Sequence, residues 1–540
     1  MITISKTKVT SVVLAASMLF SAQLGVTSAV ASSPASISNV STPKAPVVTS
    51  QTISLNGSNT SVDFRTQAFS GATPANPATP EVPRTNVLVH RLSQIAAAIN
   101  ATVTPRPVFT EIVRGRPTPV KVDASNRTFK VDVNGNTYWI TQNSPIARVG
   151  AASSTAQYSA LRTVTLDRAP VVISGNLHVQ IDNFFSLIGG ESIIVGNTKE
   201  FSSFKLLTDV LDQKLLNANT SLIVKGTENN NEYYTVSNAS RVATKLNGIT
   251  VDASELLPSP DGTKVAYLDE NGKVFVYTFG PNGNGTEVEV SSNTTEKVEL
   301  EWTDNNTLYF IMGERQNIIA RVNVSTGTIT NVVNDNINYK SQLNVTSDGT
   351  KMSYLVSVPA VTTANTTGLQ PDSDNIEFDV TVNTNGTEPQ LYVFDSTAQN
   401  PAPAKLTSSV DNKTFTTAFA DGTSVFLSTD TSDDESLPTL SIVKGTNLRT
   451  LVLANVEIVN YTQLGDKLIV QGTYAEPGST VSKDFIYEID TFKNRAKTLF
   501  EIPADAMDIS IGATSSQISY ITETGKTFVR KGNSWFQLTN

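Results

Sequence analysis

The chain has 540 residues, of which 39% are hydrophobic and 16% charged, enough apolar material for more than one core. Its net charge of -9, with a pI near 5.0 and no basic stripe, argues against nucleic acid as a partner. The lack of cysteine excludes disulfides, zinc ribbons, iron–sulfur clusters and thiol nucleophiles, and in an exported protein it is typical of bacteria.

Residues 1–31 follow the order of a signal peptide: basic residues, an apolar run, then small residues. Lys6 and Lys8 precede the run from Val9 to Val26, and cleavage is expected after Ala31. The alternative, a membrane anchor, needs about 20 strongly apolar residues, whereas serines and a glutamine interrupt this run. No second apolar run of that length follows. We therefore expect a secreted or envelope-associated protein without a transmembrane segment in the mature chain.

Residues 32–84 are rich in Ser, Thr, Pro and Ala, a composition that predicts a solvated, partly extended linker. A short amphipathic helix is predicted next, from about Asn86 to Ile99, because apolar side chains there recur on one helical face. From Phe129 to Ile140, two alternating strands about an Asn134-Gly135 turn predict a β-hairpin.

The segment from about 129 to 195 continues with an Ala-Pro-Val-Val stretch, a short strand and a helix that ends in Phe-Phe-Ser-Leu-Ile-Gly-Gly. This order resembles the copper amine oxidase N-terminal-like domain of bacterial secreted proteins. The resemblance implies a small α+β accessory module, placed here at 85–200, and its name does not imply bound copper. A type 2 copper site needs several imidazoles, and the chain has two histidines, His90 and His178. Because His178 sits on a predicted strand, we expect it to be structural.

Beyond about Phe201 the sequence becomes a series of short apolar strands and turns, with a period of about 40 to 50 residues. The best-preserved unit, Leu257 to Tyr277, has a Ser259-Pro-Asp-Gly262 turn, a strand, an Asn271-Gly272 turn and a second strand. Weaker units open at Leu300, Leu343, Phe415, Val459 and Ile509, and Asn219 to Leu246 could supply another.

About four short strands per period are typical of β-propeller blades, which bury their faces by stacking around an axis. The Ser-Pro-Asp-Gly and Tyr-Leu pattern resembles the TolB-type or WD40-like propeller repeat of bacterial envelope proteins. The predicted fold is therefore mainly β: a six- or seven-bladed propeller over 201–540, preceded by a small N-terminal α+β accessory domain. The Asp-Gly pairs are interpreted as turn residues, since a repeated calcium or carbohydrate contact would need further ligands at fixed offsets.

Few residues point to catalysis. No histidine follows His178, so the propeller cannot supply a Ser-His-Asp triad, and no Gly-x-Ser-x-Gly elbow or phosphate-binding loop is present. We expect no catalytic residue and no cofactor. Calcium favours several loop carboxylates together, which makes Asp430, Asp433, Asp434 and Glu435 weak candidate ligands. The alternative is that they are solvated loop residues, as is expected for the cluster at 372–374.

The first functional hypothesis is a non-enzymatic exported protein whose propeller binds a protein or a cell-wall glycan. The long insertions at 359–385 and 429–438 are candidates for a partner-facing rim, or else tolerated decorations. The alternatives are a glycan-acting propeller enzyme that uses carboxylates, and a structural component of the cell surface. Two paired carboxylates in one axial pocket would favour the enzyme, whereas a shallow, uncharged axial mouth would favour the binding scaffold.

Overall fold

The computed structural model describes residues 49–69, 85–105, 107–114, 116–121, 127–152, 158–195, 198–226, 231–250, 255–291, 295–366, 378–433, 436–451, 453–476 and 481–540. Within these ranges no helix is long and apolar enough to cross a bilayer. The predicted signal peptide lies outside the described residues.

The first part of the chain folds into two sheets with two helices. A seven-stranded sheet has the order β11-β12-β3-β2-β1-β14-β13, and a five-stranded sheet has the order β10-β9-β8-β7-β4. The first sheet comprises β1 (Thr49–Leu55), β2 (Ser58–Phe69), β3 (Thr85–Arg91), β11 (Val171–Ile173), β12 (Asn176–Val179), β13 (Glu191–Val195) and β14 (Thr198–Ser202). The second comprises β4 (Thr102–Pro105), β7 (Thr128–Val133), β8 (Asn136–Thr141), β9 (Ile146–Ala151) and β10 (Arg162–Thr165). A separate hairpin pairs β5 (Val108–Val113) with β6 (Arg116–Lys121).

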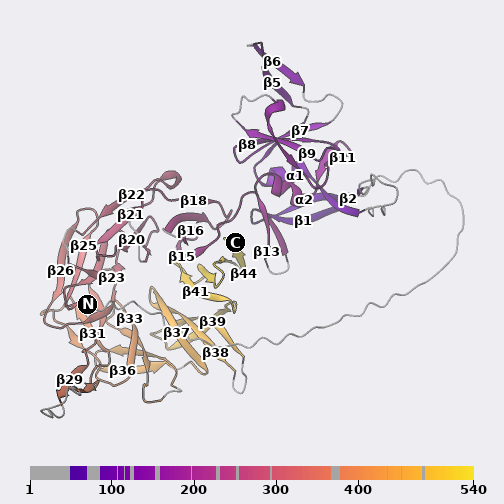
Figure 1. Ribbon diagram of the computed structural model, residues 1–540. Coiled ribbons are helices and arrows are strands. Elements are labelled where there is room, and N and C mark those ends of the chain that lie inside the picture. Colours follow the sequence, from indigo (N-terminus) through magenta and orange to yellow (C-terminus); the bar gives the residue numbers. More distant parts are fainter. Residues whose placement is uncertain are drawn as a thin grey trace, which may run out of the picture. The chain divides into compact units, whose positions relative to one another are not determined.

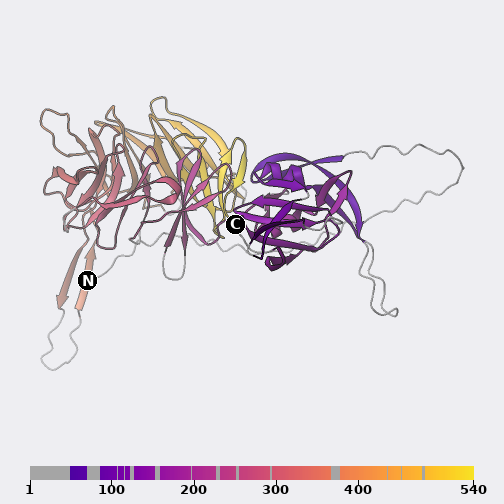
Figure 2. The same ribbon diagram turned by 90° about the horizontal axis from the view of Figure 1, so that it is seen from above.

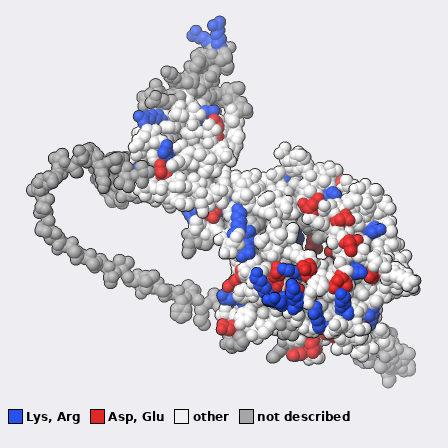
Figure 3. Space-filling view, turned by 180° about the vertical axis from the view of Figure 1, so that it is seen from behind, with Lys and Arg blue, Asp and Glu red and all other residues white. Residues whose placement is uncertain are grey.

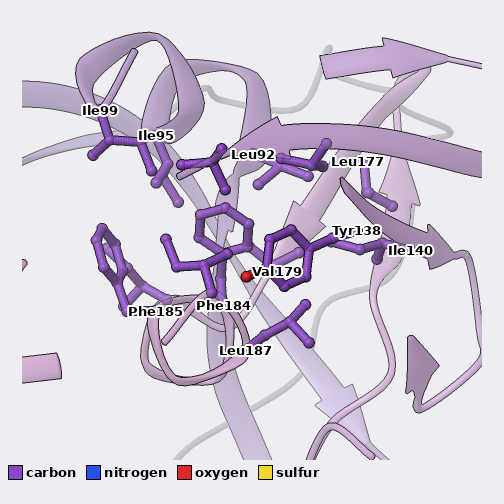
Figure 4. Close-up of a cluster of buried hydrophobic side chains, with 14 of the residues drawn as sticks. Leu92, Ile95, Ile99, Tyr138, Ile140, Leu177, Val179, Phe184, Phe185 and Leu187 are labelled. Atoms are coloured by element: carbon purple, nitrogen blue, oxygen red, sulfur yellow. The ribbon is translucent and has the colours of Figure 1, made fainter. Parts of the chain in front are cut away.

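The helices α1 (Leu92–Ala98) and α2 (Ile181–Leu187) complete the core of this domain. Their apolar faces meet side chains from both sheets, so one buried cluster joins all layers (Figure 4). Phe184 and Phe185 of α2 are each 1% exposed, and Phe185 contacts the ring of Phe201 from β14. Burying one such side chain stabilises the fold by about 1.5–3 kcal/mol, so the small helices are held by packing.

Two sequence-based predictions are wrong in this region. Residues 49–69, predicted as part of a linker, form β1 and β2, joined by an Asn56-Gly57 turn in which both residues have positive φ. Their many Ser and Thr residues are compatible with strands, and the turn has the signature of a hairpin. The predicted helix at Asn86 to Ile99 begins only at Leu92. The residues before it form β3, which lies between β2 and β12. Both Val89 and His90 of β3 are buried, so both faces of this strand are covered.

The rest of the chain forms seven successive four-stranded antiparallel sheets, each with its strands in sequence order apart from one insertion. Figure 1 shows them arranged in a circle, as expected for a β-propeller. In order they are β15–β18 (Val210–Asn217, Thr220–Gly226, Asn231–Ser237, Ala243–Lys245), β19–β22 (Leu257–Pro258, Lys264–Leu268, Val274–Thr278, Thr286–Glu289) and β23–β26 (Lys297–Trp302, Thr307–Met312, Ile318–Asn323, Thr328–Asn334). The fourth is β27, β28, β31 and β32 (Lys340–Val345, Lys351–Val356, Gln390–Asp395, Ala404–Lys405). The last three are β33–β36 (Asn412–Ala418, Ser424–Thr429, Thr439–Lys444, Asn447–Leu451), β37–β40 (Val456–Leu464, Lys467–Ala475, Ser482–Asp490, Arg495–Glu501) and β41–β44 (Ala506–Ile511, Ile518–Thr522, Thr527–Lys531, Ser534–Gln537).

The seven sheets, called blades 1 to 7 below, are joined by seven separate buried clusters. Each cluster combines side chains of two successive blades, and one combines blade 7 with blade 1. That last cluster packs Val210 and Ile223 with Ile521 and Phe536. The described residues therefore form a closed ring, held mainly by apolar contacts between blades. Both the propeller and the mainly β class with an N-terminal α+β domain agree with the sequence-based prediction.

The ring is closed without a shared strand. All four strands of blade 7 come from the C-terminal stretch 506–537 and all four of blade 1 from 210–245, each in sequence order. Hydrogen bonds at this junction reach back to the β13–β14 hairpin: Asn540 donates to the Glu191 carboxylate (3.3 Å), and the buried Arg241 of blade 1 forms an ion pair with Glu200. Arg241 also donates to the carbonyl of Gln537 (2.6 Å).

Blade 4 carries the longest insertion described here. Strands β29 (Val361–Thr366) and β30 (Phe378–Asn383) pair only with each other and lie between the second and third strands of the blade. Figure 2 shows this hairpin projecting from the ring. It falls in the predicted insertion 359–385.

Candidate functional site

The first strand of each blade lies next to the propeller axis. Successive first strands contact one another across the blade boundaries, as β23 does with β27, and β27 with β33. We call these the inner strands. Their residues line an axial cavity of about 460 Å³. The lining comes from blades 2 to 6: Pro260, Glu301, Trp302, Thr303, Asn344, Val345, Ser347, Phe415, Thr416, Thr417, Tyr461, Thr462, Gln463 and Gly465. Figure 3 shows one face of the ring, which is hollowed near its middle and has both acidic and basic side chains on the surface around the hollow.

The inner strands of blades 3, 4 and 5 share a β-bulge at the cavity. In each strand two residues oppose one on the neighbouring strand, between Val298 and Glu301 in blade 3 and at the matching places in blades 4 and 5. The first bulged residues are Glu299, Gln342 and Phe415, with φ of 58°, 52° and 52°. A non-glycine residue in this conformation costs about 1–2 kcal/mol, and such strain persists only where the surroundings fix it.

Contacts between neighbouring blades fix these bulges. The Glu299 carboxylate accepts a hydrogen bond from the backbone N–H of Leu343 (2.9 Å), and the Gln342 amide oxygen accepts one from the N–H of Phe415. The carbonyl of Phe415 in turn accepts a hydrogen bond from the hydroxyl of Tyr461 in blade 6. Each bulge therefore holds the next, and the cavity wall is a connected hydrogen-bonded series across four blades.

Glu301 is the one carboxylate among the described residues that line the cavity. Its side chain is half-buried, and it accepts a hydrogen bond from the Nδ2 group of Asn344 (3.3 Å), whose Oδ1 accepts from the N–H of Ala418 (2.8 Å). Burial raises the pKa of Glu301 to about 8. The described lining residues include no Lys, Arg or His side chain whose charge would lower this pKa again. Burial therefore favours the protonated form of this carboxyl group at neutral pH.

Three buried lysines begin the bulged inner strands. Lys297, Lys340 and Lys413 are 1%, 0% and 0% exposed, and burial lowers the pKa of each. Each ammonium group donates to a carbonyl oxygen of the preceding loop: Lys297 to Thr295 (2.5 Å), Lys340 to Ile337 and Lys413 to Asp411 (2.7 Å). Lys340 also donates to the Asn317 carbonyl (2.7 Å), in the loop between β24 and β25. These lysines hold the loops that enter the axial region, so they position the site without lining the cavity.

The Asp-Gly pairs have the turn role that the sequence predicts. In blade 2, the Asp261 carboxylate accepts hydrogen bonds from the hydroxyl of Ser259 (2.8 Å) and the N–H of Thr263 (2.9 Å). The bond from the N–H two residues on recurs at Asp348 and Asp421, and Asp348 also accepts one from the hydroxyl of Thr346 (2.6 Å). These carboxylates are occupied by their own turns. The turns nevertheless reach the cavity, because Pro260 belongs to its lining.

The candidate calcium ligands are only partly described. Asp430 is exposed, and its carboxylate accepts hydrogen bonds from the N–H (2.9 Å) and hydroxyl (2.6 Å) of Ser432. Asp433 is exposed as well, whereas Asp434 and Glu435 lie outside the described residues. Across the described ranges, no three His, Asp or Glu side chains are grouped to hold a metal ion. Calcium binding at this loop remains a prediction, and residues 372–374 lie outside the described ranges.

The two histidines lie in the N-terminal domain. His178 is on β12, as predicted, and its Nδ1 lies 3.0 Å from the carbonyl oxygen of Asn176. Burial lowers the pKa of His90 and His178, so both imidazoles are neutral at pH 7. His90 borders a cleft of about 740 Å³, whose wall includes the ion pair of Lys199 with Asp182 (2.5 Å). Two imidazoles on adjacent strands fall short of the several that a type 2 copper site needs.

Sequence reasoning missed the axial residues, although a signal for them exists. Lysine opens three successive inner strands as Lys-Val-Glu-Leu-Glu, Lys-Ser-Gln-Leu-Asn and Lys-Thr-Phe-Thr-Thr, starting at Lys297, Lys340 and Lys413. In each, the fifth residue lines the cavity: Glu301, Asn344 and Thr417. The bulge makes this pattern irregular, since it breaks the alternation by which strands are recognised.

Comparisons with known proteins return only distant likenesses. No protein-family model matches the chain, and no curated protein matches it. Among solved structures, tricorn protease matches with a TM-score of 0.41 and 10% identity, covering 91% of this chain and 52% of that chain. The β-propeller domain of the Trilobed protease from Pyrococcus furiosus matches with 0.39 and 13%, covering 62% and 97%. TolB from Acinetobacter baumannii matches with 0.32 and 14%, covering 57% and 75%.

These likenesses are distant, and the chain spans about half of the tricorn protease chain, 52%. Similarity at this level carries no argument about activity, so the propeller assignment rests on the seven sheets and their closed ring. None of these matches bears on the resemblance of residues 129–195 to the copper amine oxidase N-terminal-like domain, which remains a prediction.

Proposed function

We propose that this chain is an exported, non-catalytic binding protein whose propeller holds part of a protein or cell-wall glycan in the axial cavity. The observation that carries the proposal is the cavity itself, which five blades line and a strained, interlocked backbone shapes. Its volume of about 460 Å³ lies in the range of ligand pockets, about 300–1,000 Å³. Export is supported by the signal-peptide pattern of residues 1–31.

The composition of the cavity supports binding over glycan cleavage. Glycoside hydrolases as a rule place two carboxyl groups on either side of the scissile bond, and Glu301 is the single carboxyl group among the described lining residues. Charged side chains surround the hollow of the ring on the face in Figure 3, so the mouth of the cavity is not uncharged and neither of the two outcomes set out from the sequence is met in full. A lone protonated acid among hydroxyl, amide and aromatic groups suits recognition.

The test measures two quantities together: the amount of the chain retained on a ligand preparation and the amount of polysaccharide cleaved. The full chain is incubated with insoluble wall polysaccharide and with solubilised envelope proteins, and bound chain and released sugar ends are both quantified. Thr462, which is exposed and lines the cavity, is replaced in Thr462→Trp to fill it. Thr498→Trp, on the exposed outer strand β40 of the same blade, is the matched control.

We expect retention on one of the two preparations, lost with Thr462→Trp and kept with Thr498→Trp, and no release of sugar ends. Retention that both variants keep would show that the axial cavity is not the binding site. Turnover of the polysaccharide would instead establish the enzyme.

A further inference from the structure

The described lining of the axial cavity contains one acidic side chain and no basic one. The acidic side chain is that of Glu301, which reaches the cavity from an inner strand. Its carboxyl group has one polar contact, the Nδ2 group of Asn344 at 3.3 Å, which is long for a hydrogen bond to a charged group. The charged form of this carboxyl group would need a cationic partner. The described residues that line the cavity supply none.

Aromatic side chains form part of the same lining. Trp302, Phe415 and Tyr461 all border the cavity, and the rings of Phe415 and Tyr461 lie 6.3 Å apart at 57°. Phe415 is 44% exposed although its backbone has positive φ, so the strain presents an apolar ring to solvent. Aromatic faces attract cations by about 0.5–2 kcal/mol, more when water is excluded.

Hydroxyl and amide groups make up most of the remaining lining. Thr303, Ser347, Thr462 and Gln463 come from blades 3, 4 and 6 and converge on the same space. Such groups pair with the hydroxyls of a sugar, and the exposed ring of Phe415 offers an apolar face for a sugar ring. This combination of polar groups and an aromatic ring favours a sugar as the ligand.

We infer that the axial cavity recognises an amino sugar with a free amine, whose ammonium group pairs with the Glu301 carboxylate against the aromatic rings. The inference rests on the proposed function, since it names the ligand of the same cavity. Binding moves one proton: the carboxyl group of Glu301 releases it to solvent and becomes the counter-ion of the ammonium group. No covalent bond forms or breaks in the ligand. Because burial raises the pKa of Glu301 to about 8, this release occurs at neutral pH.

The experiment compares glucosamine oligomers with the same oligomers after N-acetylation, by calorimetric titration of the full chain. We expect the free amines to bind at least about tenfold more tightly, a difference of about 1.4 kcal/mol. Titration at a pH low enough for the amine to be fully protonated, in two buffers of different ionisation enthalpy, should show the release of close to one proton per bound ligand. A lysine peptide and its acetylated form make up the second arm.

Variants identify the counter-ion. Glu301→Gln should bring the amine oligomer to the affinity of the acetylated one and abolish proton release. Glu457→Gln is the matched control, because Glu457 is an exposed inner-strand residue outside the cavity lining. If Glu301→Gln does not fold, Phe415→Leu replaces it, and a several-fold weaker affinity is expected for the amine oligomer alone.

Equal affinity for both oligomers, no binding of either, or proton release that Glu301→Gln leaves intact would overturn the inference. Selective binding of the lysine peptide would overturn it as well, in favour of a peptide ligand. The proposed function is judged separately, by retention on wall polysaccharide or envelope protein and its loss with Thr462→Trp. It survives if a neutral sugar or a peptide proves to be the ligand.

Discussion

Gly262 is the residue at which the repeat turn is least tolerant of change. Its φ is +67°, and a Cβ placed on it would collide with the backbone carbonyl of Leu216 in blade 1. Gly422 occupies the matching turn of blade 5 with φ +84° and nothing within 4 Å of such a Cβ. Substitutions at these two glycines therefore separate the cost of backbone strain from the cost of the close approach between blades 1 and 2.

Gly262→Ala should therefore destabilise the propeller by more than Gly422→Ala. The second substitution adds only the cost of the left-handed conformation, about 1–2 kcal/mol, and the first adds a displacement of blade 1. Urea unfolding of both variants checks this. Equal shifts in the unfolding midpoint would show that the contact with Leu216 relaxes freely.

Lys340 illustrates how a buried charge is retained. Its ammonium group donates to the Asn317 carbonyl and pairs with Asp335 at 2.7 Å while its side chain is 0% exposed. Lys340→Met would leave Asp335 and the loop carbonyls without their partner, a loss of about 3–5 kcal/mol. Lys444, paired with Asp421 but 59% exposed, is the control, and Lys444→Met should cost at most about 1 kcal/mol. Denaturant unfolding of the two variants tests the difference.

Glu301 also makes stability depend on pH. Burial raises the pKa of its carboxyl group from 4.5 to about 8, so between these values the folded state binds a proton that the unfolded state has lost. Stability must therefore fall as pH rises through this window. Glu301→Gln should flatten that part of the profile when unfolding midpoints are compared at several pH values. A slope that persists in the variant would assign it to other groups.

At the level of single residues, the sequence predicts the turns well but does not reveal the residues of the axial cavity. Asp261 and Gly262 are recognisable because their roles are local: the carboxylate binds the next backbone N–H groups and glycine accepts positive φ. Glu301 gains its importance from Asn344 and Phe415, which are distant in sequence and meet it only around the axis. Nothing local marks a glutamate on a polar strand as a cavity residue.

At the scale of elements, the blades could be found because each strand pair is local. The second and third strands carry apolar residues on both faces, as in Lys264–Leu268 and Val274–Thr278, and an Asn-Gly turn joins them. The inner strands are harder to recognise from the sequence, because bulges interrupt the alternation of apolar and polar side chains. β1 and β2 were missed because a Ser- and Thr-rich segment has the composition of a linker, although the Asn56-Gly57 turn marks a hairpin.

The β29–β30 hairpin should be dispensable for folding. Its strands pair only with each other, and Val361, Val380 and Val382 are 62%, 56% and 54% exposed. Replacing residues 361–383 by a short Gly-Ser turn removes no strand pairing of the described blades, so the free energy of unfolding in urea should stay within about 0.5 kcal/mol of the parent. A lower midpoint would reveal a structural role for the insertion. An unchanged midpoint with lost retention on wall or envelope material would make it part of the partner-facing rim.

At the scale of the whole molecule, the junction of blades 7 and 1 is where the ring depends on other parts of the chain. Its apolar cluster is supplemented by Arg241, which stacks on Phe536 at 4.0 Å and pairs with Glu200 of β14. A Cβ on Gly57, in the turn after β1, would collide with the same Phe536 ring. The N-terminal domain therefore braces both sides of the junction.

Arg241→Met should loosen this junction more than the rest of the ring. Glu200 would lose its cationic partner and the Gln537 carbonyl its donor, at a cost of about 3–5 kcal/mol. Hydrogen exchange should accelerate in β15 and β41 to β44 and change little in β27 and β28. Arg315→Met, at an exposed arginine of blade 3, is the control. Uniform acceleration around the ring would show that the blades open together.

The three buried lysines make it possible to follow the opening of individual blades by chemical modification. Acylating reagents modify amines that solvent reaches, so Lys297, Lys340 and Lys413 should remain unmodified in the native protein while exposed lysines such as Lys493 react. Each lies in a different blade, and peptide mass spectrometry distinguishes them. Their modification rates would report the opening of blades 3, 4 and 5 individually, without any engineered probe.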